Sequence, residues 1–233
     1  MDDRYDAELD IRVNFCHEAL SPLGFRRVCA LDPIDPDVIA RFQKEVETST
    51  TENPMQRFLW EYPQILCRLL GGGYCWWVKQ EVWLGQEFRL DFLAARTESL
   101  LLNYRLVEIE NPAAKWFNPS NGKPATKMVE ATQQVGDWHH WISLNQDYAQ
   151  REKPFGLGLV NLTPLAASSH ILIGQRKNVT PSDRQRLNAI RSSGGRYWVN
   201  TYDSLIEAAK RVPQNFYGDG DDDICSECQY LLD

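Results

Sequence analysis

The 233-residue chain has no apolar run that approaches the ~20 residues of a membrane-spanning helix. Its acidic beginning, MDDRYDAELD, lacks the basic and apolar segments of a secretory signal peptide. Six cysteines are spread along the chain without the dense spacing of a small disulfide framework, so we expect reduced thiols. These absences predict a soluble, cytoplasmic protein with no membrane partner.

Several familiar catalytic and metal-binding patterns are also missing. The glycine run after Leu70 is not followed by a Lys-Ser or Lys-Thr pair, which excludes a P-loop and indicates a helix end. No Ser-His-Asp or Cys-His arrangement stands out. The Cys225-x-x-Cys228 pair supplies only two of the roughly four ligands of a structural zinc site. His139 and His140 lie between two tryptophans, which is typical of a packed aromatic helix face.

The formal net charge of -7 is unevenly distributed. Acids are concentrated in residues 1–50 and 214–233, whereas residues 101–213 carry an excess of Lys and Arg. The overall charge therefore does not exclude a nucleic-acid partner, although an excess of this size is common on protein surfaces.

The order of apolar periodicities predicts an α/β domain with a mixed sheet flanked by helices. Strands are expected at residues 76–83, 88–95, 101–110, 155–162, 169–174 and 197–201. Helices are expected at residues 36–47, 54–70, 126–145 and 204–212, and from Thr180, which opens a capping box, to Gly194. We expect an accessory segment at 1–50, the main domain at 51–213 and an acidic tail at 214–233.

Three acids interrupt two of these apolar strands. Asp91 lies within one, and Glu108 and Glu110 lie within the next. Strand side chains alternate between faces, so Glu108 and Glu110 point the same way while their apolar neighbours enter a core. An acid in an apolar strand is costly unless a cation meets it, and Mg²⁺ takes oxygen ligands. The pattern favours a divalent-metal site; ordinary ion pairs with Arg89 and Arg105 are the alternative.

This layout resembles the PD-(D/E)XK nuclease core, a restriction-endonuclease-like fold, and four ordered segments resemble the Shedu anti-phage defence family. The segments are the helix beginning Glu52-Asn-Pro-Met-Gln-Arg-Phe-Leu-Trp, the strands with Asp91-Phe-Leu and Val107-Glu-Ile, the helix with Gln134 and Trp138, and the pair Ile171-Leu-Ile-Gly-Gln-Arg and Asn200-Thr-Tyr-Asp-Ser-Leu-Ile. Together they cover about residues 50–212.

The resemblance implies a Mg²⁺- or Mn²⁺-dependent DNA endonuclease that acts on phage or other foreign DNA and forms dimers or tetramers. It implies that Asp91 and Glu108 bind the metal together with the Ile109 carbonyl. Glu110 would occupy the third position of the catalytic motif, and Gln134 would support the site.

One residue departs from the family pattern, because Glu110 stands where E-x-K has its lysine. Glu110 could act as a base or ligand in an E-x-E variant. Lys115 could instead supply the cation from the following loop. In a third interpretation the domain is catalytically silent, and serves as a nucleic-acid-binding or regulatory module on the same fold.

Two weaker sets of candidates complete the prediction. Glu61, on the first helix of the main domain, is either a further metal ligand or a surface residue. Lys115, Lys123 and Lys127 follow the metal strands and are candidates for holding the DNA backbone, although lysines in such a loop commonly serve solubility.

Overall fold

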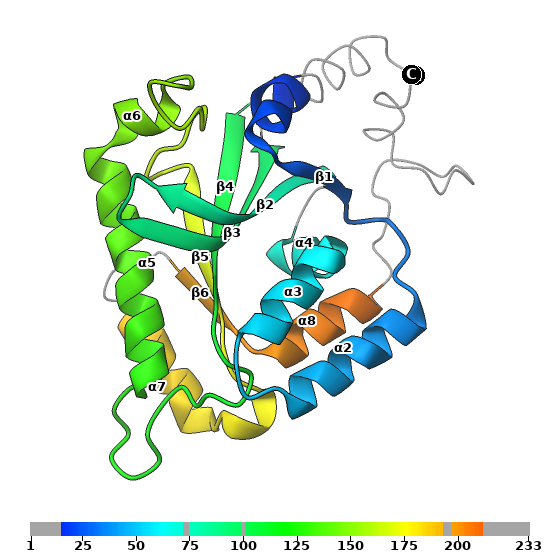
Figure 1. Ribbon diagram of the computed structural model, residues 1–233. Coiled ribbons are helices and arrows are strands. Elements are labelled where there is room, and N and C mark those ends of the chain that lie inside the picture. The colour runs from blue at the N-terminus through cyan, green and yellow to red at the C-terminus, as the bar shows by residue number, and fades with distance from the viewer. Residues whose placement is uncertain (1–14, 72–74, 99–100, 193–196, 212–233) are drawn as a thin grey trace.

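A six-stranded mixed sheet forms the centre of the computed structural model, which describes residues 15–71, 75–98, 101–192 and 197–211 (Figure 1). The strands lie in chain order from β1 to β6. Strands β1 to β4 are antiparallel neighbours, whereas β4, β5 and β6 are parallel. Their bounds are β1 Arg26–Cys29, β2 Cys75–Leu84, β3 Phe88–Glu98, β4 Leu101–Ile109, β5 Ala167–Leu172 and β6 Tyr197–Asn200.

Helices cover both faces of the sheet. In Figure 1, α5 lies on one side, and α2, α3, α4 and α8 lie on the other. The α-helices are α2 Pro36–Thr48, α3 Asn53–Glu61, α4 Pro63–Leu70, α5 Thr126–Leu144, α6 Gln146–Gln150, α7 Pro181–Ser192 and α8 Tyr202–Lys210, and short 3₁₀ helices occur at Ser21–Leu23 and Arg176–Asn178. None of the helices in the described ranges is long and apolar enough to cross a membrane.

Two hydrophobic cores result, one on each face. The α5 core contains Trp138 and Leu106, and the core on the other face, the α8 core, contains Leu59 and Tyr202. Burial of this apolar surface is the main term that stabilises such a layered fold. The predicted α/β class with a mixed sheet flanked by helices is confirmed.

Two predicted elements are wrong. The single helix expected at residues 54–70 is two helices, because Tyr62 leaves helical geometry at φ -124° and ψ 66°, and Pro63 begins α4. The strand expected at residues 155–162 is a series of turns. There the amides of Leu157 and Leu159 donate to the carbonyls of Tyr148 and Ala149 at the end of α5–α6, instead of joining the sheet.

The other predicted strands and helices occur within a few residues of their expected bounds. The capping box is also present: the Asp183 carboxylate accepts from the Thr180 amide at 2.9 Å, and the Thr180 hydroxyl accepts from the Asp183 amide at 3.2 Å. Strand β1 was not predicted. The expected helix end at Gly194, the Cys225–Cys228 pair and the tail 214–233 lie outside the described residues.

Candidate active site

The candidate site opens where β3 and β4 separate. Their paired residues run from Glu98 opposite Leu101 to Phe92 opposite Val107. Beyond that point β3 stays paired with β2, and β4 stays paired with β5. The acids Asp91 and Glu108 are the next residues on the two separating strands, so the sheet topology brings them together.

The Asp91 carboxylate takes the place of a backbone carbonyl as the acceptor of one hydrogen bond between β3 and β4. Its Oδ2 accepts from the Ile109 amide at 2.7 Å, and its Oδ1 accepts from the Gln56 side chain at 3.2 Å. Burial raises the pKa of Asp91 to about 6, although the Ile109 hydrogen bond opposes the shift. The alternative ion pair with Arg89 is not seen: the Arg89 guanidinium pairs with Glu81 at 3.1 Å, although its charge lowers the pKa of Asp91.

A reversal of side-chain alternation accompanies Asp91. Leu93 and Ala95 enter the α5 core, and Leu90 enters the same core although simple alternation would send it to the other face. On the neighbouring strand, Glu81 has a left-handed backbone with φ 51°. This conformation is uncommon for a residue with a side chain, and it marks a local distortion of the sheet beside the site.

Glu108 is nearly inaccessible, with 6% of its surface exposed, and points away from the α8 core that holds Val107 and Ile109. The Gln134 side chain donates to its Oε2 at 3.0 Å. Burial, reinforced by the charges of Asp91 and Glu110, raises the pKa of Glu108 to about 9. The alternative pair with Arg105 is not seen; the Arg105 guanidinium donates to the Tyr104 carbonyl at 3.3 Å.

Glu110 is also buried, with 5% exposed. Its backbone is fixed on both sides: its amide donates to the Leu172 carbonyl at 2.8 Å, and its carbonyl accepts from the Tyr202 hydroxyl at 2.7 Å. Burial raises the pKa of its carboxyl group, and the Lys127 ammonium, 3.4 Å from its Oε2, opposes this shift.

These acids line a pocket of about 610 Å³ between the opened strands and α5. One face of α5 contributes polar side chains at helical spacing: Lys127, Glu130, Gln134 and Asp137, together with Gln133. The β2–β3 hairpin contributes Trp83, which is 52% exposed, and Arg89. The pocket thus combines a strongly acidic floor with an exposed aromatic ring at its edge.

Comparison with protein families gives a match that covers most of the chain. The family model described as "Shedu protein SduA, C-terminal" matches residues 49–206. The chain belongs to the Shedu family. No curated protein sequence matches the chain significantly. Shedu membership implies a role in anti-phage defence, and the matched range contains β2 to β6 with every acid of the pocket floor.

The structure places some of the predicted site residues of this Shedu domain in the pocket and others outside it. Asp91, Glu108, Ile109, Glu110, Gln134 and Lys127 all line the pocket. Glu61 does not; it is exposed at the far end of α3, 4.0 Å from the Arg41 guanidinium. Lys115 and Lys123 are exposed and do not line the pocket either.

Glu52 is an acid of the pocket that the sequence prediction missed. It is half-buried, precedes α3 and lines the pocket, and its charge contributes to the raised pKa values of Asp91, Glu108 and Glu110. The Asn111 side chain donates to the Thr50 carbonyl and so ties the segment before α3 to the end of β4. The available signal was an acid directly before a helix that begins Asn-Pro.

The pocket suits a metal that keeps part of its water shell. Within the described ranges no group of three or more His, Cys, Asp or Glu side chains is arranged to hold a metal ion. Asp91 and Glu108 form a pair of adjacent carboxyl groups whose charges act on one another, and the Glu110 Oε2 is buried without a hydrogen bond. Two carboxylates with several waters are a common Mg²⁺ environment, so the residues present fit this ion.

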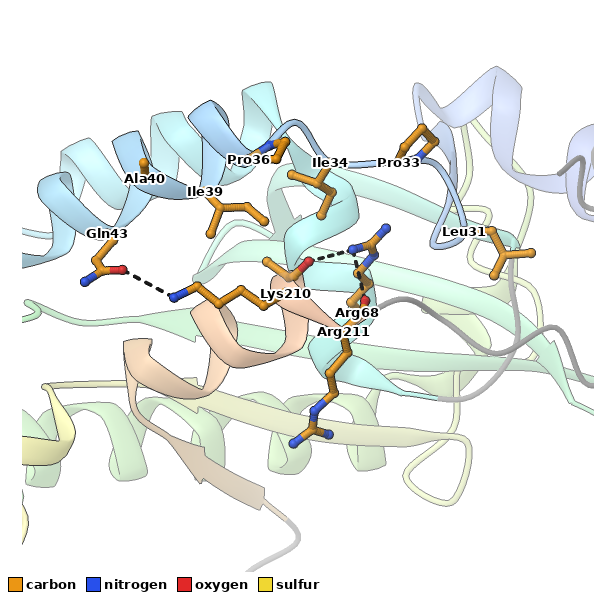
Figure 2. Close-up of a pocket in the computed structure, with 11 residues that line it drawn as sticks. Leu31, Pro33, Ile34, Pro36, Ile39, Ala40, Gln43, Arg68, Lys210 and Arg211 are labelled. Carbon is orange, nitrogen blue, oxygen red and sulfur yellow. Dashed lines mark hydrogen bonds between the residues drawn. The ribbon is translucent and has the colours of Figure 1, made fainter.

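A second pocket, of about 640 Å³, lies among α2, α4 and α8 and does not have this chemistry. Figure 2 shows Arg68 within it, donating to the carbonyls of Ala209 and Arg211 at 2.7 and 3.3 Å. Arg68 also donates to the carbonyls of Ala30 and Asp32. The guanidinium therefore joins three segments of the Shedu fold, and most of the remaining lining is apolar.

Proposed function

We propose that the chain is a metal-dependent endonuclease that hydrolyses phosphodiester bonds of phage or other foreign DNA. The observation that carries this proposal is the pair of carboxyl groups formed by half-buried Asp91 and buried Glu108, at the opening between β3 and β4 of a Shedu-family domain. Two carboxylates alone would repel a phosphate, and a divalent cation held between them would offset the charge that develops on it.

Asp91 and Glu108 would hold Mg²⁺ or Mn²⁺, with the Ile109 carbonyl as a further ligand. When bound, the metal would supply Lewis-acid stabilisation and lower the pKa of a water. Glu108 must lose its proton to act as a ligand, and Gln134 orients its carboxyl group through a 3.0 Å hydrogen bond. Trp83 at the pocket edge offers a ring on which a displaced base could stack.

The decisive experiment combines plasmid cleavage with a direct binding measurement. We expect the wild type to nick supercoiled plasmid with Mg²⁺ or Mn²⁺ and to bind Mn²⁺ in calorimetry without DNA. Glu108→Ala should lose both properties, because one of two anchoring carboxylates is gone. Glu61→Ala is the matched control, since Glu61 is exposed outside the pocket, and should cut like the wild type. Metal-independent cutting would contradict the proposal.

A catalytically silent module is the competing function, and the observation that favours it is Glu110 at the lysine position. The same experiment separates the two. A silent module would bind DNA but would not cut it with either metal, at any protein concentration. Self-assembly into dimers or tetramers belongs to the nuclease proposal, and light scattering of the purified chain measures it.

A further inference from the structure

Lys127 lies at the beginning of α5 and reaches into the pocket of acids. Its ammonium is 3.4 Å from the Glu110 Oε2 and 3.0 Å from the Glu130 Oε2. Half of its side chain remains exposed. The charge is therefore held at the pocket by two carboxylates, yet it is still accessible to a molecule that enters.

Glu110 is fixed in a position that favours pairing with the Lys127 ammonium. Its side chain is 7% exposed, and its backbone is fixed by hydrogen bonds with Leu172 and Tyr202. No hydrogen bond satisfies its Oε2, so the nearby ammonium is what compensates this buried oxygen. A buried carboxylate that lost the ammonium beside it would be strongly destabilised, so the position of the Lys127 charge and the stability of Glu110 depend on one another.

Other cations of this region are placed differently. Arg89 also lines the pocket, but its guanidinium is paired with Glu81 at 3.1 Å. Lys115 and Lys123, in the loop between β4 and α5, do not line it. Of the cations that line the pocket, Arg89 lowers the pKa of Asp91, whereas Lys127 lowers the pKa of Glu108. Lys127 is therefore the lysine of the pocket that lies near Glu108 and contacts Glu110.

We infer that Lys127 is a catalytic residue of the proposed nuclease, and that the Glu110–Lys127 pair takes the place of a lysine on β4. This inference rests on the proposed function. In the reaction, the oxygen of a water bonds to phosphorus and one phosphorus–ester bond breaks. One proton of that water passes to solvent, and the departing oxygen takes up a proton. Lys127 remains an ammonium and stabilises the charge that gathers on the non-bridging oxygens.

A charge exchange tests this pairing. The variants are Lys127→Ala, Lys127→Arg, Lys127→Glu and the double variant Glu110→Lys with Lys127→Glu. Loss of a single transition-state donor typically costs about 100-fold or more in rate, so Lys127→Ala should cut plasmid at least about 100-fold more slowly. Lys127→Arg should keep part of the activity. The double variant should cut at least about 10-fold faster than Lys127→Glu, because an opposite pair is restored.

Mn²⁺ binding by calorimetry supplies a readout that does not depend on cutting. Lys127→Ala should bind Mn²⁺ at least as tightly as the wild type, since it removes a positive charge from the site. A merely structural lysine would lower Mn²⁺ binding and activity together. Lys44→Ala, an exposed lysine on α2 that lines no described pocket, is the control and should behave as the wild type.

Two results would overturn the inference and leave the proposed function standing. In the first, the wild type cuts and Lys127→Ala cuts within about threefold of it. In the second, the double variant binds Mn²⁺ but cuts no faster than Lys127→Glu. A wild type that does not cut with either metal would overturn the proposed function and this inference together.

Discussion

At the scale of single residues, Asp91 has a structural task besides its proposed chemical one. Its carboxylate accepts a hydrogen bond from the Ile109 amide. In a regular sheet a backbone carbonyl of β3 would accept that hydrogen bond. Since a buried amide without a partner costs about 1–3 kcal/mol, this hydrogen bond helps to hold the two strands where they separate. A loss of activity on substitution of Asp91 therefore has two causes, which variants can separate.

We predict that Asp91→Ala unfolds at lower denaturant concentration than Asp91→Asn. Both substitutions remove the charge, but asparagine retains an oxygen that accepts from Ile109. The difference should be about 1–3 kcal/mol in the free energy of unfolding. Both variants should lose Mn²⁺ binding. Equal stability of the two would show that the Ile109 hydrogen bond contributes nothing.

Glu108 predicts a pH-dependent stability. Its pKa is about 9 in the folded chain and lies near the ordinary value of 4.5 when unfolded. The stability that the protonated carboxyl contributes is complete below about pH 4.5, and is lost as the pH rises toward 9. Glu108→Gln should therefore raise the melting temperature of the metal-free protein at pH 8, but not near pH 4.

The size of the effect is measurable by differential scanning calorimetry. About 1 kcal/mol corresponds to about 2–4 °C in a chain of this length, so we expect a gain of at least that order at pH 8. Gln134→Ala serves as the comparison, because it keeps the ionisable group and should retain the pH dependence of the wild type. A gain for Glu108→Gln that is equal at both pH values would contradict this assignment.

At the scale of elements, the sequence was most informative where periodicity and an interrupting acid occur in one strand. The strands carrying Asp91, Glu108 and Glu110 were predictable because their signals are local. The acid that the first helix of the main domain contributes to the pocket was not predictable from the sequence. Glu61 and Glu52 lie at opposite ends of α3, and only the tertiary packing of that helix decides which end meets the sheet.

Other misses share this cause. The apolar residues after Phe155 have strand composition, but Gly156 packs against the backbone of Tyr148 and Arg151 so closely that no side chain fits. Gly158 has φ 73°. These contacts belong to the end of the α5–α6 segment and have no local signature. Lys127 lines the pocket and Lys115 does not. This difference likewise depends on the path of the loop before α5, which has no local signature in the sequence.

The distorted strand beside the site leads to a further prediction. Glu81, with φ 51°, should accept glycine more readily than valine, because a β-branched residue is strongly disfavoured in the left-handed region. Glu81→Val should be less stable than Glu81→Gly by about 1–3 kcal/mol in urea unfolding. Both variants lose the pair with Arg89, so that interaction cancels in the comparison. Equal stabilities would contradict the backbone argument.

At the scale of the whole molecule, Arg68 connects regions that are distant in sequence. It donates to carbonyls of the β1–α2 connection and of the end of α8. We predict that Arg68→Met lowers the free energy of unfolding by roughly 3 kcal/mol, because several carbonyls lose their donor. Arg57→Met, at an exposed position of α3, is the control and should change thermal stability little. A similar effect of both substitutions would contradict the proposed role of Arg68.

The hydrogen bond from Tyr202 to the Glu110 carbonyl has a consequence for the newly made chain. Tyr202 follows Glu110 by 92 residues, and strand β5 beside Glu110 is also made later. At about 5–20 residues per second, a ribosome needs about 5–20 s to cover that distance. During this interval the nascent chain already contains Asp91 and Glu108 but lacks the support that fixes the end of β4. A nuclease built in this way would become competent only after Tyr202 has been made.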